Sequence, residues 1–154
     1  MKFLNEDTIN RFSEHISTVF GVGYTAYAPG TMGSLYGLLL YMFLKDASVF
    51  IYVSFVIVLF VVGVFVSDVM EEIYGIKDPS FVIIDEVVGM MIAFISVPYT
   101  PLVAIAGFLL FRIVDISKVP PLNLLEKIGG GFGIMIDDAV GGLIVNIILQ
   151  VLTR

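Results

Sequence analysis

Two pairs of neighbouring carboxylates interrupt the apolar parts of this sequence. Asp85 and Glu86 lie within VIIDEVVGM (residues 82–90), and Asp137 and Asp138 lie within IMIDDAVGG (residues 134–142). Ionisable residues in membrane-like apolar segments are costly, so their default interpretation is functional. Several carboxylate oxygens together suit a hard divalent cation such as Mg²⁺ or Mn²⁺, and Ca²⁺ also fits. The two pairs therefore predict a metal site, although each pair could also simply mark a helix N-terminus, where negative charge is favoured.

Four further charged residues could complete such a site. Asp78 and Asp115 add carboxylates, and Arg112 and Lys118 supply the opposite charge. Arginine binds phosphate with a bidentate fork and lysine binds it as a point charge, whereas the alternative role of both is to anchor a membrane protein at the cytoplasmic surface. Cations beside metal ligands favour metal-assisted transfer or hydrolysis of a phosphate group carried by a lipid.

Exposed backbone N–H groups are predicted at two places. IGGGFG (residues 128–133), which includes Gly130 and Gly131, leads into the second acid pair, and Thr31 is a natural N-cap of an apolar helix. Helix starts of this kind bind anions. The glycine run lacks the ending of a P-loop, so as a motif it is weak.

The composition indicates a membrane protein. Of the 154 residues, 58 % are hydrophobic and 14 % are charged, and the mean hydropathy is +1.03; soluble domains carry about a quarter charged residues. The net charge of −6 argues against binding to nucleic acid. With no cysteine and one histidine, His15, thiolate chemistry and a His-rich zinc site are excluded.

Hydrophobic periodicity predicts an all-α integral membrane bundle. We expect residues 7–20 to form an amphipathic helix that lies at the membrane interface or packs on the bundle, and residues 21–154 to form a helical core that carries the site. We expect one membrane-embedded domain over residues 1–154, with four or five membrane helices. The apolar segments are 32–44, 47–66, 81–97, 102–114 and 134–152. The polar stretches 67–80 and 111–133 should lie outside the membrane.

The distribution of cations predicts the topology. If the N-terminus is cytoplasmic and each apolar segment crosses once, six cations face the cytoplasm and two face the other side. The first set is Lys2, Arg11, Lys77, Arg112, Lys118 and Lys127, and the second is Lys45 and Arg154. This bias agrees with the positive-inside rule. The same assignment places both acid pairs at cytoplasmic ends of helices.

Four blocks of the sequence together resemble the phosphatidylglycerophosphatase A family in order and spacing. They are APGTMGSL (28–35), DPSFVIIDEVVGM (78–90), FRIVDISK (111–118) and GGFGIMIDD (130–138). The resemblance implies an all-helical, Mg²⁺-dependent lipid phosphatase of the bacterial inner membrane. It would hydrolyse phosphatidylglycerophosphate to phosphatidylglycerol and phosphate. This chain departs from the family where it has KVPP (118–121) and where Gly129 replaces a histidine that some members carry.

The blocks also suggest roles for individual residues. The expected catalytic residues are Asp85, Glu86, Asp115, Asp137 and Asp138. The expected Mg²⁺ ligands are Asp78, Asp85, Glu86, Asp137 and Asp138. The expected substrate-binding residues are Thr31, Arg112, Lys118, Gly130 and Gly131. A homo-oligomer is compatible with the sequence, and the alternative function is a divalent-cation or ion-coupled transporter that uses the same carboxylates.

Overall fold

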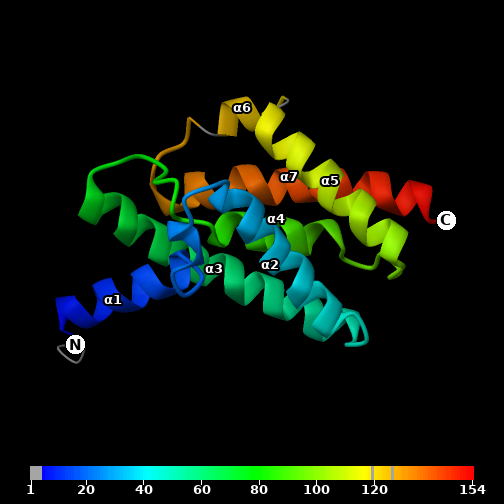
Figure 1. Cartoon of the computed structure of the whole chain (residues 1–154), viewed down its shortest axis with the longest axis horizontal. Coiled ribbons are helices and arrows are strands. Elements are labelled where there is room, and N and C mark those ends of the chain that lie inside the picture. Colours follow the sequence, from blue (N-terminus) through cyan, green and yellow to red (C-terminus); the bar gives the residue numbers. More distant parts are fainter. Residues whose placement is uncertain (1–4, 119, 126) are drawn as a thin grey trace.

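The computed structural model describes residues 5–118, 120–125 and 127–154 of the chain. Within these ranges every regular element is a helix, which confirms the predicted all-α class (Figure 1). The helices are α1 (Glu6–Ser17), η1 (Val22–Tyr24), α2 (Pro29–Leu44), α3 (Val49–Tyr74), α4 (Ile84–Ala93), α5 (Pro101–Ser117), α6 (Leu122–Leu125) and α7 (Gly130–Leu152).

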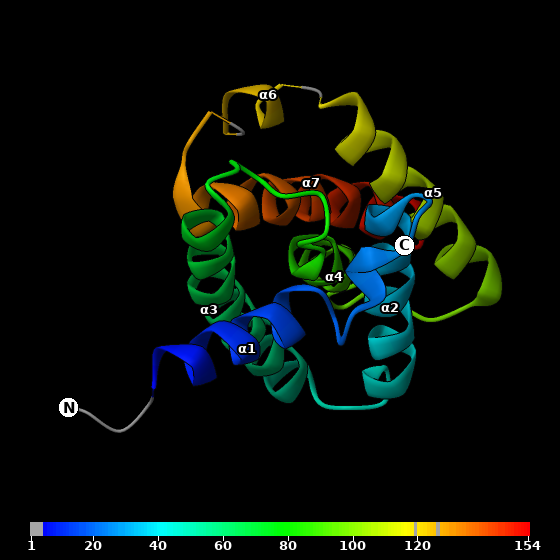
Figure 2. The ribbon, with the colours of Figure 1, turned by 60° about the vertical axis from the view of Figure 1, so that its left-hand side comes forward.

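The long helices alternate in direction. α2, α4 and α7 run one way along the bundle, and α3 and α5 run the other way (Figure 1). The starts of α2, α4 and α7 therefore share one end of the molecule with the ends of α3 and α5. Figure 2 shows α4 enclosed by α2, α3, α5 and α7. Because of this enclosure, Val88, Met90 and Met91 of α4 have no exposed surface.

Small residues allow α4 to approach its neighbours backbone to backbone. A β-carbon at Gly142 of α7 would lie 2.2 Å from the carbonyl oxygen of Gly89, and one at Gly89 would lie 2.6 Å from the carbonyl oxygen of Asp138. On the other side, a β-carbon at Gly37 of α2 would lie 2.5 Å from the carbonyl oxygen of Val87. Such close approach is typical of helices in membranes, where packing has to replace the hydrophobic effect.

The end of α4 is buried, so its last carbonyl groups need partners within the protein. The hydroxyl of Tyr52 donates to the carbonyl of Met91 at 2.8 Å. The side-chain amide of Asn146 donates to the carbonyls of Ala93 at 3.1 Å and Ile95 at 2.8 Å. Side chains from α3 and α7 thereby fix the end of α4 that lies opposite the acid pair.

Two of the described helices, α3 and α7, are long and apolar enough to cross a membrane. This is fewer than the four or five crossings that we expected. α2 and α5 have 16 and 17 residues, and α4, for which we expected residues 81–97, has only ten. A ten-residue helix is about 15 Å long, half of a bilayer core. α3 nevertheless exposes large apolar side chains, among them Phe50, Val58 and Phe65, as expected for a helix that faces lipid.

Several helix boundaries differ from the prediction. α2 begins at Pro29 with Ala28 as its N-cap, so Thr31 lies in the first turn and is not the cap. The reason is that proline is well suited to the first helical position. α3 continues eight residues beyond residue 66, because Met70 packs into the core and Gly75 ends the helix in the left-handed conformation. α7 begins at Gly130, four residues before the predicted start.

Replacement of Gly142 by alanine should destabilise the bundle. The new methyl group would overlap the backbone of α4, so α4 and α7 would have to separate, at a cost of about 2 kcal/mol. We expect a lower thermal unfolding midpoint in detergent. Gly129→Ala is the matched control, because a β-carbon at Gly129 meets nothing within 4 Å. Equal midpoints for the two variants would contradict the close α4–α7 contact.

Candidate active site

Three carboxylates from two helices meet in the interior of the bundle. Asp85 and Glu86 lie in the first turn of α4, and Asp138 lies two turns into α7. One oxygen from each of the three lies within 4.8 Å of the others. The exposed fractions of Asp85 and Asp138 are only 8 % and 2 %. We call these three residues the acid cluster.

Each member of the acid cluster keeps an oxygen without a hydrogen bond. Oδ1 of Asp85, Oε2 of Glu86 and Oδ2 of Asp138 are buried and have no hydrogen-bond partner among the described residues. A buried acceptor without a partner costs about 1–3 kcal/mol, and more when it is charged. Unpartnered oxygens on three clustered carboxylates, all of them hard ligands, fit a divalent cation. The residues present are therefore compatible with Mg²⁺, whose binding at this site stays a prediction.

The first turn of α2 covers Glu86. A β-carbon at Gly30 would lie 2.3 Å from Oε1 of Glu86 and 3.3 Å from Nη1 of Arg112. Glycine at residue 30 therefore leaves the space that the carboxylate and the guanidinium occupy. The turn that begins α2 thus forms one wall of the site.

The two cations of α5 lie next to the acid cluster and are linked by Asp115. Nη1 of Arg112 donates to Oδ2 of Asp115 at 2.5 Å and to Oγ of Ser34 at 3.3 Å. Nζ of Lys118 lies 3.2 Å from Oδ1 of Asp115 and donates to Oδ2 of Asp137 at 2.6 Å. The same Nζ lies 3.9 Å from Oδ1 of Asp138. The ion pairs connect α5 to α7 at the edge of the acid cluster.

The backbone at the end of α5 directs Lys118 into the site. Lys118 is the C-cap of α5 and has a φ of 43°, in the left-handed region that is unfavourable for lysine. Burial alone would lower the pKa of Lys118, but the hydrogen bond to Asp137 and the negative charges of Asp138, Asp137 and Asp115 raise it overall. Lys118 therefore remains protonated, and its ion pairs offset the backbone strain.

The charges at this end of the bundle do not balance. Five carboxylates (Asp85, Glu86, Asp115, Asp137 and Asp138) face two cations (Arg112 and Lys118), which leaves three negative charges if every acid is ionised. Uncompensated charge in a poorly solvated site is costly. A bound divalent cation would remove most of this excess, in agreement with the unpartnered oxygens.

Other residues that we expected at the site lie around it. Asp78 is exposed in the loop between α3 and α4 and lines a cavity of about 380 Å³ with Lys77, Asn123 and Lys127. It is not one of the three clustered acids, so its role as a metal ligand stays a prediction. Thr31 lies in the first turn of α2, one residue after Gly30. Its proposed contact with substrate also stays a prediction.

Gly130 and Gly131 have partners that we did not expect. Their N–H groups donate to Oε1 of Glu71 at 3.3 Å and to Oδ1 of Asp68 at 3.0 Å. Sequence reasoning overlooked both acids, because we assigned residues 67–80 to a polar extension outside the membrane. Their spacing of three residues, which places them on one face of a helix, was the available signal. Ser34, now a partner of Arg112, was part of a recognised block but had no assigned role.

The fold and the site define a class of protein. The chain is a helical bundle with two helices long and apolar enough to cross a membrane, and its buried acidic site is flanked by arginine and lysine, the residue types that bind phosphate groups. The sequence profile of the phosphatidylglycerophosphatase A family matches residues 15–153. The chain therefore belongs to the phosphatidylglycerophosphatase A family and is a phosphoric monoester hydrolase. This family membership favours an enzyme over the alternative of a transporter.

Three relatives show this similarity along most of their length. Phosphatidylglycerophosphatase A of Escherichia coli strain K12 is 33 % identical over 127 residues, 81 % of this chain and 74 % of the relative. Phosphatidylglycerophosphatase A of Haemophilus influenzae is 35 % identical over 133 residues, which cover 84 % of this chain and 82 % of the relative. A Bacteroides thetaiotaomicron protein with the name "Putative phosphatidylinositol-3-phosphatase" is 35 % identical over 144 residues, which cover 88 % of this chain and 90 % of the relative. No solved structure matches the chain.

Lys118→Met should destabilise the protein by leaving its acidic partners unpaired. Because Asp137 is buried and its partner is partly exposed, we expect a loss of about 1–3 kcal/mol. Asp137→Asn added to Lys118→Met should recover part of this loss, since the amide does not need a cation. Thermal unfolding in detergent measures the four members of this double-mutant cycle. Lys77→Met, at an exposed lysine, is the control, and additive effects of the two substitutions would contradict the ion pair.

Proposed function

We propose that this chain is a Mg²⁺-dependent phosphatase that hydrolyses phosphatidylglycerophosphate to phosphatidylglycerol and phosphate at the cytoplasmic face of the bacterial inner membrane. The observation that carries the proposal is the acid cluster, with its unpartnered oxygens, beside the paired cations of α5. The names of two relatives support the choice of substrate.

The acid cluster supplies the proposed Mg²⁺ ligands. Asp85, Glu86 and Asp138 would hold the ion, with Asp137 and Asp78 as further ligands expected from the sequence. When bound, Mg²⁺ supplies positive charge that polarises the phosphate and stabilises charge that develops during hydrolysis. The start of α4 also stabilises negative charge at the site, because Asp85 and Glu86 in its first turn lie at the positive end of the helix dipole.

The cations of α5 bind the phosphate to be removed. Arg112 and Lys118 are already oriented by Asp115 and Asp137, so little side-chain freedom is lost when substrate binds. Arg112 retains a buried Nε without a partner among the described residues, which leaves it a free donor for a phosphate oxygen. The oxygen of a water molecule bonds to phosphorus while a carboxylate of the site accepts one of its protons, and the bond between phosphorus and the alcohol oxygen breaks. The protonated carboxylate returns the proton to that oxygen, so phosphatidylglycerol and phosphate leave and the site is restored.

The end of the bundle that carries the site is the proposed cytoplasmic end. α1, the loop after α3, the end of α5 and the segment before α7 lie at this end and carry Arg11, Lys77, Arg112, Lys118 and Lys127 (Figure 1). Lys45 and Arg154 belong to segments at the opposite end, and Lys2 lies outside the described residues. A surplus of cations marks the cytoplasmic side of a multi-pass protein.

A substrate panel tests the proposed reaction. We expect the purified protein in detergent to release phosphate from phosphatidylglycerophosphate only when Mg²⁺ is present. Phosphatidylinositol 3-phosphate, phosphatidate and lysophosphatidate serve as competitors, the first because one relative is named for it. A preference for phosphatidylinositol 3-phosphate would contradict the proposed substrate, and full activity in excess chelator would contradict the Mg²⁺ requirement.

Asp85→Asn and Asp138→Asn should abolish phosphate release. Each removes a charged ligand while keeping the shape of the side chain, so we expect a loss of about 100-fold or more in kcat. Both variants should also lose the rise in thermal midpoint that Mg²⁺ gives to the unaltered protein, which is a readout independent of turnover. Asp46→Asn, at a side chain that is 85 % exposed, is the matched control. Retained activity and retained Mg²⁺ stabilisation in both variants would overturn the assignment.

A further inference from the structure

The first turn of α7 lies directly against the backbone of α3. A β-carbon at Gly131 would lie 1.9 Å from the carbonyl oxygen of Val64 and 2.6 Å from the backbone nitrogen of Asp68. Gly130 has a φ of 76°, which only glycine adopts at little cost. Gly130 and Gly131 therefore belong to a close backbone contact between α7 and α3 and do not form an open loop.

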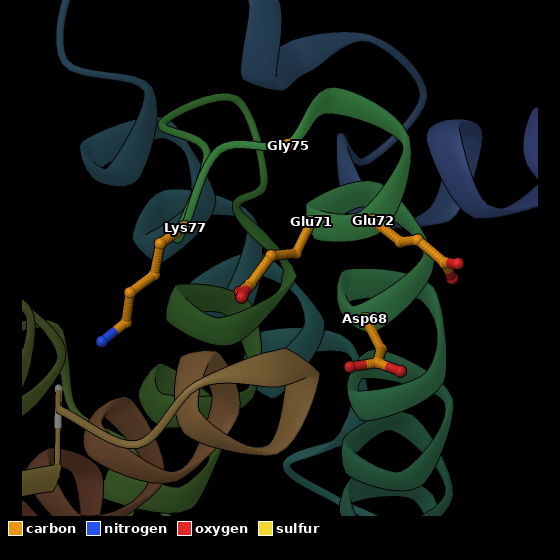
Figure 3. A pocket seen from close by; sticks show the side chains of 5 residues that line it. All are labelled: Asp68, Glu71, Glu72, Gly75 and Lys77. Atoms are coloured by element: carbon orange, nitrogen blue, oxygen red, sulfur yellow. The ribbon is translucent and has the colours of Figure 1, made fainter.

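Two carboxylates of α3 accept hydrogen bonds across this contact. Oε1 of Glu71 accepts from the N–H of Gly130 at 3.3 Å, and Oδ1 of Asp68 accepts from the N–H of Gly131 at 3.0 Å. Figure 3 shows both side chains on the side of α3 that faces the start of α7, and Glu72 on the far side. The three acids line an open pocket of about 570 Å³ with Gly75 and Lys77.

The chemistry of a helix start explains why acids occupy these positions. The first N–H groups of a helix have no partner within the helix. They also form the positive end of its dipole, which attracts carboxylates. Asp68 and Glu71 satisfy both requirements for α7, and they do so from another helix. Their hydrogen bonds therefore fix where α7 begins relative to α3.

The position of this start matters for the site. Asp137 follows Gly130 by seven residues, about two turns, on the same uninterrupted helix. Asp138 has to meet Asp85 and Glu86, which belong to α4. A shift of the first turn of α7 is thus transmitted along the helix and separates the carboxylates of the acid cluster.

We infer that Asp68 and Glu71 are positioning residues, which hold the catalytic carboxylates of α7 in register with those of α4 by accepting hydrogen bonds from Gly130 and Gly131. This inference rests on the proposed function, because it assigns the two acids a role in the same reaction. It also assigns the N–H groups of the glycine run a partner within the protein instead of the phosphate.

The test compares three variants of the full-length protein in detergent. The double substitution Asp68→Ala/Glu71→Ala removes both acceptors. Asp68→Asn/Glu71→Gln keeps an acceptor oxygen at each position and removes only the charge. Glu72→Ala is the matched control, since Glu72 lies on the same turn of α3 and lines the same pocket but faces away from α7.

Three measurements separate positioning from general stability. Hydrogen exchange of residues 130–136 reports the capping directly and needs no catalysis. The Mg²⁺ concentration that gives half of the maximal rise in thermal midpoint reports the geometry of the acid cluster. Kinetics with phosphatidylglycerophosphate separate kcat from KM. A purely structural role would lower the thermal midpoint without changing the Mg²⁺ concentration or kcat of the folded protein.

We expect the double alanine variant to exchange residues 130–136 faster, to need about tenfold more Mg²⁺ and to lose about tenfold in kcat with little change in KM, because small displacements of catalytic groups are costly. The Asn/Gln variant should recover most of each effect, and Glu72→Ala should behave like the unaltered protein. If the double variant does not fold, the single alanine variants replace it.

Two results would overturn the inference. One is a double alanine variant that matches Glu72→Ala in all three measurements. The other is faster exchange with unchanged Mg²⁺ response and kcat, which would make the two acids simple helix caps. Failure of the proposed function looks different, because then the unaltered protein itself shows neither Mg²⁺ stabilisation nor turnover, while hydrogen exchange still decides whether Asp68 and Glu71 cap α7.

Discussion

The burial of negative charge is the constraint on which the rest of this structure depends. Asp85 and Asp138 lie almost without solvent contact in a bundle whose outer surface is largely apolar. Charge in such surroundings must be compensated by cations, hydrogen bonds or a bound ion. Arg112 and Lys118 compensate part of it from α5, and the unpartnered oxygens of the acid cluster remain for a cation. The same charge imbalance that would destabilise the protein on its own makes this end of the bundle suitable for the Mg²⁺ and phosphate that we propose to bind there.

The alternating direction of the helices explains how distant segments serve one site. Because α2, α4 and α7 run parallel, their starts converge, and the end of α5 joins them (Figure 1). Close packing then brings the side chains within reach, since Gly30, Gly89 and Gly142 leave no side chain between neighbouring helices. Stability and chemistry share these contacts, because the interface between α4 and α7 holds the fold together and also aligns the carboxylates that each helix carries.

The sequence was a good guide to residue types and a poor one to distances and partners. Carboxylates in apolar runs are rare enough that Asp85, Glu86, Asp137 and Asp138 were identifiable, and the structure brings them to one end of the bundle. Periodicity predicted all-α structure. It could not predict that α4 has ten residues, because buried apolar loops and buried helices have the same composition. Nor could it predict the contacts of Asp68 and Glu71 with α7, which depend on tertiary packing between helices far apart in sequence.

The short, doubly anchored α4 determines the depth of the chemistry. Tyr52 and Asn146 hold the carbonyls of Met91 and Ala93 at its end. These carbonyls lie six and eight residues after Asp85, which is about 9–12 Å along the helix. The end of α4 opposite the acid cluster is therefore anchored, which sets the depth of Asp85 and Glu86 along the bundle axis. If the substrate is the phospholipid that we propose, its headgroup has to reach this depth. Access of the headgroup to the acid cluster would then be part of the proposed reaction. A lipid with a longer or shorter distance between its glycerol backbone and its terminal phosphate would place that phosphate away from the acid cluster.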